Sequence, residues 1–497
     1  MSAGSGAAAP GTIRSLVPAR LDRLPWTRFH WRVITGLGAA WILDGLEIQI
    51  VATVGTVLQD RATLHLTTGD VGLLASVYLL GEVVGALVFG RLTDILGRRR
   101  LFLVTLITYL VASGIGGLAW NLPFLLVFRF IAGTGIGGEY TAINSAIDEL
   151  IPSYYRGRTD IIVNGSYWAG AMIGAAASIL LLNPNLLPIN AGWRIGFFIG
   201  PVIGILAIYL RSVLPESPRW LMTHGRNEEA EKIVGDIEEH ARKRGVKIEP
   251  VPESKALEVT GRGVIPYLEI ARTVLRSYPG RSFLGFSMMV TQAFLYNAIF
   301  FSQASVLHNF YKVPSDRVGV FFFPFALGNL LGPLLIGHLF DTVGRRLMIM
   351  ITYCGSAIIL AISALLFAAG GLTAVTQTLF WCGAFFLASA GASSAYLTVS
   401  EIFPLELRGQ AIALFFAVSQ LAGGVAAPFI FGLLIGNGTS RGPLTIGYMI
   451  GAAVMFIGGL IAWFFGVNAE RKSLEEIATP LSAVVPSVGK PEGAPAS

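Results

Sequence analysis

Four ionisable residues lie inside long apolar stretches of the sequence, where charge is costly and marks a candidate functional site. Asp44 and Glu47 are three residues apart and therefore share one face of a helix. Arg129 and Glu139 lie ten residues, or about 15 Å, apart along a second helical stretch. Because burial favours a neutral carboxyl group and a nearby arginine favours the carboxylate, movement of Arg129 away from Asp44 would drive proton uptake. All four are candidates for proton coupling, and the alternative is a permanent Asp44–Arg129 ion pair that only joins two helices.

Other polar and small residues in apolar stretches have a structural interpretation. Glu82 stands between Gly81 and Gly85, and we interpret it as an interhelical hydrogen-bonding residue. The segment Gly133-Thr134-Gly135-Ile136-Gly137-Gly138 superficially matches a phosphate-binding loop, but no strand precedes it, and small residues within a span permit close helix packing. The histidines are scattered, both cysteines lie in apolar runs, and no nucleophile–base pair is apparent, so we expect no metal, no cofactor and no enzymatic activity.

The composition identifies the elements that must position these residues. Of the 497 residues, 54% are hydrophobic and only 13% are charged, which is too apolar for an ordinary water-soluble protein. This excludes a disordered chain, a disulfide scaffold and a soluble enzyme with a single anchor. The expected partner is therefore the lipid bilayer, and the net charge of +6 does not indicate nucleic acid.

Long apolar runs predict an all-α polytopic membrane protein with twelve transmembrane helices in two bundles of six. The expected spans cover 32–58, 71–92, 100–119, 122–145, 161–182, 193–213, 283–306, 317–339, 346–369, 373–400, 410–435 and 444–466. The expected domains are a cytoplasmic N-terminal tail (1–30), two six-helix bundles (31–213 and 282–467), a cytoplasmic linker (214–281) and a cytoplasmic C-terminal tail (468–497). In the linker, Ala230, Ile233, Val234 and Ile237 recur at helical spacing and predict an amphipathic helix packed under the bundle. The low-complexity stretch before Gly11 and the end of the chain from about Thr479 indicate disordered tails.

The distribution of basic residues predicts the orientation of the chain. Of 36 Lys and Arg residues, one lies within a span, thirty lie on the side of the termini, and five lie on the opposite side: Arg61, Arg194, Lys312, Arg317 and Arg441. By the positive-inside rule both termini are expected in the cytoplasm, with the protein in the plasma (inner) membrane.

Two motifs occur once in each half and predict duplicated six-helix units. The first joins the second and third spans of each half: a Gly is followed four residues on by Asp and three residues later by Gly-Arg, at Gly90–Arg98 and again at Gly337–Arg345. The second follows the fourth span of each half and places a Glu seven residues before an Arg, at Glu149–Arg156 and Glu401–Arg408. Charged connectors of this kind can hold two bundles together at the cytoplasmic side, whereas the alternative is that the arginines only set topology. The candidate gate residues are Gly90, Asp94, Gly97, Arg98, Glu149, Arg156, Arg158, Asp341, Arg345, Glu401 and Arg408.

With the segments 215–221 and 400–409, these motifs resemble the major facilitator superfamily, in particular its sugar-porter and organic or aromatic acid:proton symporter branches. The resemblance runs from about Arg20 to Leu474 and implies two bundles that rock about a central site. Asp44 and Arg129-Phe130 match an acid and an Arg-Phe pair of proton-coupled sugar porters. Asp44-Gly45-Leu46-Glu47 is similar to the Asp-Gly-x-Asp of aromatic-acid symporters, with Glu in place of the second Asp.

The seventh span is similar to the Gln-Gln-x-x-Gly-Ile-Asn segment of sugar porters, but Thr291 and Leu295 replace the first Gln and the Gly. Few amide or hydroxyl groups remain for a sugar, whereas aromatic residues supply walls and an arginine can clamp a carboxylate. The candidate solute-binding residues are Arg129, Trp168, Gln292, Tyr296, Asn297 and Phe300. We therefore expect a monomer that takes up a small organic acid, aromatic acids included, together with protons. A sugar:proton symporter or facilitator and a non-transporting solute sensor remain the alternatives.

Overall fold

The computed structural model describes residues 12–212, 215–253, 256–260, 267–402 and 408–466. The long helices of the first half are α2 (Arg28–Val57), α3 (Thr68–Leu96), α4 (Arg98–Gly116), α5 (Leu122–Leu150), α6 (Ser153–Leu181) and α7 (Ile189–Ser212). Those of the second half are α11 (Pro279–Tyr311), α12 (Ser315–Ile336), α14 (Arg345–Ala368), α15 (Ala374–Ile402), α16 (Arg408–Ser419) continued by α17 (Ala426–Ile435), and α18 (Gly442–Phe465). Short α13 (Leu339–Thr342) precedes α14.

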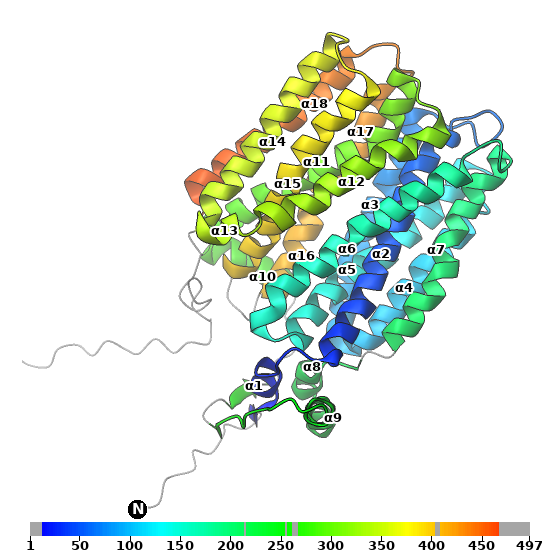
Figure 1. Cartoon of the computed structure of the whole chain (residues 1–497). Coiled ribbons are helices and arrows are strands. Elements are labelled where there is room, and N and C mark those ends of the chain that lie inside the picture. Colours follow the sequence, from blue (N-terminus) through cyan, green and yellow to red (C-terminus); the bar gives the residue numbers. More distant parts are fainter. Residues whose placement is uncertain (1–11, 213–214, 254–255, 261–266, 403–407, 467–497) are drawn as a thin grey trace, which may run out of the picture.

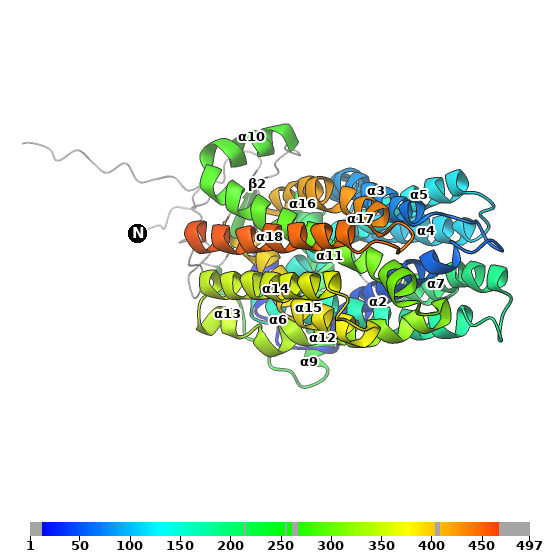
Figure 2. The same ribbon diagram turned by 90° about the horizontal axis from the view of Figure 1, so that it is seen from above.

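The predicted all-α fold of twelve membrane helices is confirmed. Within the described residues, eleven helices are long and apolar enough to cross a membrane. Helix α6 completes the twelve; its Asn164, Ser166 and small residues make it less apolar than the others. Several helices extend beyond the predicted spans, as at Ser153 and Leu150, because helical turns continue past the apolar run into polar sequence. Figures 1 and 2 show the first-half helices grouped beside those of the second half.

Glycines bring neighbouring helices of the first half into backbone contact. A Cβ added at Gly137 of α5 would lie 2.0 Å from the carbonyl oxygen of Glu82 on α3, and one at Gly85 would lie 2.0 Å from that of Thr134. A Cβ at Gly45 of α2 would similarly lie 2.0 Å from the carbonyl oxygen of Tyr167 on α6. These distances are far below van der Waals contact, so the glycine-rich segment is a helix-packing surface as predicted. The contacts fix which side of α2 and α3 faces each neighbour.

The two halves meet tightly at the end of the bundle where α3 begins, which we call the far end. A Cβ at Gly72 of α3 would lie 2.3 Å from the carbonyl oxygen of Pro428 on α17. The Thr68 hydroxyl donates to the carbonyl oxygen of Gly436 over 2.9 Å, and the amide of Phe429 donates to Ser76 Oγ over 3.1 Å. Helix α3 is thereby held against the second half at this end.

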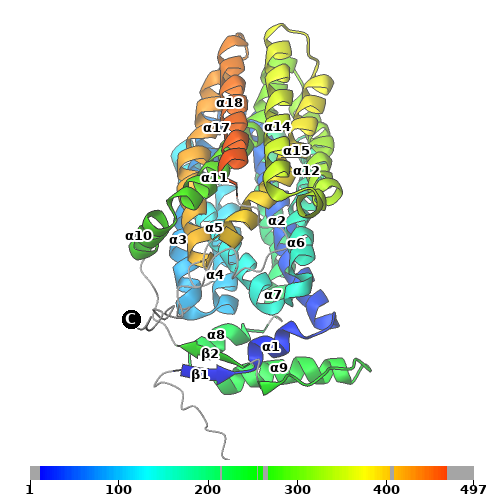
Figure 3. The same cartoon turned by 90° about the vertical axis from the view of Figure 1, so that its left-hand side faces the viewer.

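A small folded unit lies under the opposite end, which we call the linker end (Figure 3). It contains α1 (Val17–Asp22), α8 (Pro218–Thr223), α9 (Asn227–Arg242) and an antiparallel pair of strands, β1 (Thr12–Ser15) and β2 (Leu257–Thr260). We call this unit the clasp. Amphipathic α10 (Tyr267–Ser277) follows β2 and leads into α11. The strand pair lies outside the membrane helices, and it joins segments more than 240 residues apart that no local pattern links.

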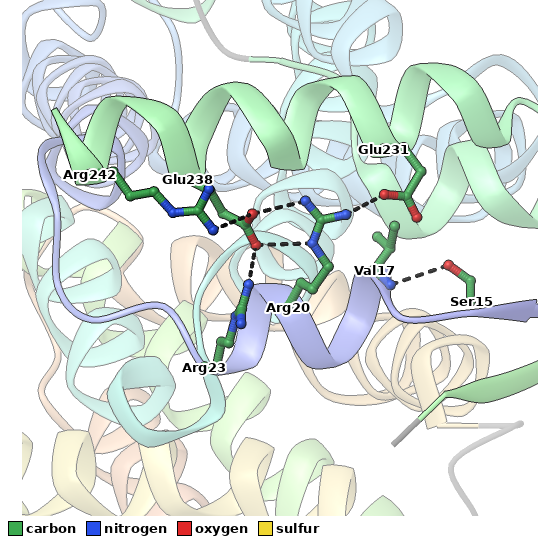
Figure 4. Close-up of polar contacts among 7 residues, drawn as sticks. All are labelled: Ser15, Val17, Arg20, Arg23, Glu231, Glu238 and Arg242. Carbon is green, nitrogen blue, oxygen red and sulfur yellow. Dashed lines mark hydrogen bonds and ion pairs between the residues drawn. The ribbon is translucent and has the colours of Figure 1, made fainter. Parts of the chain in front are cut away.

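The clasp has an apolar core and an ionic rim. Ala230, Val234 and Ile237 of α9 are buried in a cluster that includes Val17 and Trp220, so the predicted amphipathic helix packs against α1 and α8. On the rim, Glu238 accepts hydrogen bonds from Arg20 Nη2 over 2.9 Å and Arg23 Nη2 over 2.6 Å (Figure 4). Arg242 lies 3.7 Å from the same carboxylate, and Arg20 also pairs with Glu231. Part of the expected N-terminal tail is therefore folded, because its apolar and basic residues complement the linker.

Candidate functional site

A cavity of about 250 Å³ lies between the two halves and is lined by α2, α3, α5, α6, α11, α16 and the turn after α16. Five of the six candidate solute-binding residues line it: Trp168, Gln292, Tyr296, Asn297 and Phe300. Arg129 does not line the cavity. Apolar pockets with a few convergent polar groups are typical solute sites.

Aromatic side chains from both halves form one wall of this cavity. The ring of Trp168 on α6 lies 6.3 Å from Phe300 and 6.4 Å from Tyr296 on α11, measured between ring centroids. Tyr140 on α5 stacks on Phe416 of α16, with centroids 4.9 Å apart and planes inclined by 14°. A planar solute here would contact both halves at once, which is the requirement for a site about which two bundles move.

The polar side of the cavity is built on a π-helical turn, Gln420–Gly424. Asn297 Nδ2 donates to Gln420 Oε1 over 2.9 Å and to the carbonyl oxygen of Ala293 over 2.8 Å. A Cβ at Gly424 would lie 2.2 Å from Gln420 Oε1, so the glycine leaves the space that this amide pair occupies. π-turns are frequent at functional sites. Gln420 was not among the predicted residues; its polar pair Ser419-Gln420 followed by Gly423-Gly424 was the available signal.

A buried charged cluster lies beside the cavity in the first half. Asp44, Glu47 and Arg129 are each at most 2% exposed. The guanidinium carbon of Arg129 lies 4.0 Å from the ring centroid of Tyr78, and Arg129 interacts electrostatically with Glu47 and Glu82. Arg129 therefore lies within a cluster of acidic residues and does not line the cavity.

The acids of the cluster face different neighbours. Glu47 lies beside Tyr109 of α4, and a Cβ at Gly200 of α7 would lie 2.3 Å from its Oε2. Glu139 is fully buried on α5, outside the lining of the cavity. Glu82, by contrast, lines the cavity, so its interpretation as a purely interhelical residue is incomplete.

The connector motifs are partly described. Gly97 and Gly344 follow α3 and α13 with φ of +93° and +116°, values that favour glycine, and the repeated motif thus makes the same turn in both halves. A Cβ at Gly97 would lie 2.5 Å from Glu216 Oε2, and that carboxylate also accepts from the amide of Arg99. Gly90 is half-buried in α3, and Arg345 is 8% exposed at the start of α14. The side chains of the other candidate gate residues lie outside the described residues: Asp94, Arg98, Glu149, Arg156, Arg158, Asp341, Glu401 and Arg408.

Comparisons with known proteins agree with this architecture. A niacin transporter of Acinetobacter baylyi is 34% identical over 224 residues, which span 45% of this chain and 49% of that protein. A putative metabolite transport protein of Bacillus subtilis is 26% identical over 92% of this chain and 96% of its own length. Among solved structures, a D-xylose-proton symporter has a TM-score of 0.69 at 19% identity, with 90% of this chain and all of that chain covered.

The family model described as "Sugar (and other) transporter" matches residues 32–481. That match covers both bundles, the linker and every residue around the cavity. The chain therefore belongs to the sugar (and other) transporter family of the major facilitator superfamily and is a multi-pass membrane transporter of small solutes.

Proposed function

We propose that the protein takes up a small organic acid, aromatic acids included, together with protons, by alternating exposure of the cavity between its halves. The observation that carries this proposal is the aromatic wall built from both halves, with Trp168 facing Tyr296 and Phe300. Stacked or edge-on rings favour a planar apolar solute. We propose transport, with no enzymatic step, as the activity.

The polar groups of the cavity support an acid over a sugar. Asn297 is bonded to Gln420, and the Tyr296 hydroxyl donates to Asn329 Oδ1 over 2.8 Å, so part of the hydrogen-bonding capacity is already used. A sugar needs many such partners, and one relative is named a niacin transporter, niacin being an aromatic carboxylic acid. The second candidate is sugar:proton symport, supported by the amides that line the cavity and by relatives named polyol transporters.

The buried charges support proton coupling. Asp44, Glu47 and Glu139 are at most 1% exposed, and they lie in the same half of the protein as Arg129. In a low-dielectric interior the net charge of such a group depends on how many protons the acids bind. We propose these four residues as the coupling set. In this scheme Arg129 acts on the acids and not directly on the solute.

The proposed arrangement in the cell follows from the distribution of basic residues. The linker end faces the cytoplasm, both termini lie there, and the protein acts as a monomer in the plasma (inner) membrane. The bundles at 31–213 and 282–467 are the moving bodies, and the connector residues of both repeats form a cytoplasmic gate. The positive φ angles at Gly97 and Gly344 support equivalent connectors in the two halves.

Transport in proteoliposomes tests this function. The purified full chain is reconstituted, and uptake of labelled nicotinate, benzoate and xylose is measured with and without an imposed pH gradient. We expect a gradient to concentrate at least one of the acids and not xylose. Gradient-driven accumulation of xylose alone would favour the sugar symporter, and uptake that only equilibrates would refute coupling.

A further inference from the structure

Glu82 holds the charge that faces the solute cavity. Among the described residues that line the cavity, it is the one with a charged side chain, whereas Asp44, Glu47, Glu139 and Arg129 are buried outside the lining. Glu82 is 9% exposed, so the residue is nearly enclosed and still borders the cavity. A solute in this cavity therefore meets one acid directly.

The position of Glu82 is fixed by the backbone contact between α3 and α5. The carbonyl oxygen of Glu82 lies 2.0 Å from the Cβ that Gly137 lacks, and Gly81 makes a similar approach to the carbonyl oxygen of Phe130. Gly137 and Ile136 of α5 also line the cavity beside Glu82. The backbone of Glu82 therefore cannot move away from the cavity unless α3 and α5 separate.

Several titratable groups surround Glu82. Tyr78 precedes it by one turn on α3, Arg129 approaches from α5, and Tyr167 from α6. Behind Arg129 and Tyr78 lie the remaining members of the cluster, Asp44 and Glu47 of α2 and Tyr109 of α4. The cluster thus contains three carboxyl groups and one guanidinium. In a low-dielectric interior one arginine compensates one carboxylate, so full ionisation of all three acids is unfavourable.

An anionic solute makes the charge imbalance worse. A solute carboxylate beside an ionised Glu82 adds like-charge repulsion within a nearly enclosed site, whereas a protonated Glu82 offers an O–H donor to the anion. Binding of the anion and binding of a proton therefore favour each other, and by linkage the coupling is reciprocal. One proton enters with one anion, and the proton leaves Glu82 when the anion leaves.

We propose that Glu82 is the residue that carries the coupling proton in the solute cavity, next to the transported anion, and that the Asp44–Glu47–Arg129 cluster sets the charge behind it. This inference rests on the proposed uptake of an organic acid and assigns the proton to a position that the span-1 acids do not occupy. It also explains why the cavity of an acid transporter is lined by an acid and not by Arg129.

The test measures the affinity of the purified full chain for nicotinate, or for whichever acid wild type accumulates, between pH 5 and 8. For wild type we expect the affinity to fall about tenfold per pH unit above the titration of Glu82. Glu82→Gln mimics the protonated acid, so it should bind with little pH dependence and lose accumulation driven by a pH gradient. Glu82→Asp keeps a titratable group and should restore a pH-dependent affinity, which shows that the site remains folded.

Two comparisons separate the possible failures. Glu239→Gln changes an exposed linker acid and should keep wild-type accumulation, which controls for expression and insertion. The inference would be overturned if the affinity of Glu82→Gln changed with pH as much as that of wild type. It would also be overturned if Asp44→Asn lost more of this pH dependence than Glu82→Gln. In either case the uptake of an organic acid by wild type would still stand. If wild type itself accumulates no organic acid under a pH gradient, the proposed function fails first, and the inference fails with it.

Discussion

Replacement of Glu238 by Gln tests whether the N-terminal segment is held by the ionic rim of the clasp. The Glu238 side chain is 5% exposed and accepts from Arg20 Nε over 3.0 Å, from Arg20 Nη2 over 2.9 Å and from Arg23 Nη2 over 2.6 Å. Glu238→Gln keeps the shape of the side chain and one carbonyl acceptor. It removes the negative charge and the second acceptor.

The structure sets the size of the effect. Hydrogen bonds to charged groups contribute about 1.5–3 kcal/mol each. Arg20 and Arg23 keep 19% and 18% of their side-chain surface exposed, so solvent partly screens their interaction with Glu238. We therefore expect Glu238→Gln to lower the free energy that docks α1 by about 2 kcal/mol, near the low end of this range. Since about 1.4 kcal/mol corresponds to a factor of ten, α1 should undock about 30-fold more often.

Hydrogen–deuterium exchange of the full chain in nanodiscs measures this directly. Amides in 12–23 and 230–242 should exchange about 30-fold faster in Glu238→Gln, whereas amides of α14 should not change. Glu239→Gln is the matched control one residue away, because Glu239 and its partner Lys243 are both mostly exposed. Equal protection of residues 12–23 in the two variants would refute the inference that the ionic rim holds the N-terminal segment in place.

The same contacts give a pH dependence. Burial raises the pKa of the Glu238 carboxyl group, but the hydrogen bonds and charges of Arg20 and Arg23 outweigh burial and hold the pKa below its ordinary value. The stabilisation is therefore complete above the pKa of the unfolded chain, about 4.3, and is lost as the pH falls through the lower folded value. Protection of α1, corrected for intrinsic exchange, should be constant near neutral pH and decline below about pH 4 in wild type but not in Glu238→Gln.

Further predictions concern transport and topology. Gly137→Val should destabilise the α3–α5 contact by about 1–3 kcal/mol or more, because its Cβ would overlap the carbonyl oxygen of Glu82. The variant should have a lower Tm and no uptake, whereas Gly235→Ala, with open space around its Cβ, should show neither change. A cysteine near Asn437 should react with an impermeant thiol reagent in intact cells and one near Arg226 should not, and the reverse pattern would contradict the orientation. Asp94→Asn should insert normally but slow transport, and wild-type rates would reduce the connector motif to a topology signal. Asp44→Asn and Glu47→Gln, measured separately, should each impair accumulation in a pH gradient, and normal accumulation in both would exclude them from coupling.

Much of the fold follows from local sequence. Apolar runs longer than a bilayer core predict helices wherever they occur, so the spans were predicted from these runs. The structure differs at helix ends such as Ser153 and at the π-helical turn that interrupts the predicted span 410–435. The linker helix around Val234 followed from its periodicity. The repeated glycines at Gly97 and Gly344 were visible because the same turn needs the same residue twice. The residues of the seventh span that line the cavity were predicted because polar and aromatic residues interrupt an apolar helix.

Tertiary structure alone decided which way the buried charges face. The sequence places Glu47 and Glu82 in apolar helices, but Glu47 lies against Gly200 of α7 and Glu82 lines the cavity, because glycine contacts on neighbouring helices set the rotation of α2 and α3. The Asn297–Gln420 pair depends on a π-helical turn and on space left by Gly424. The pairing of β1 with β2 depends on chain segments brought together only when both halves are folded. A span's composition determines that it is a helix, whereas the partner that packs against it determines which residues line the cavity.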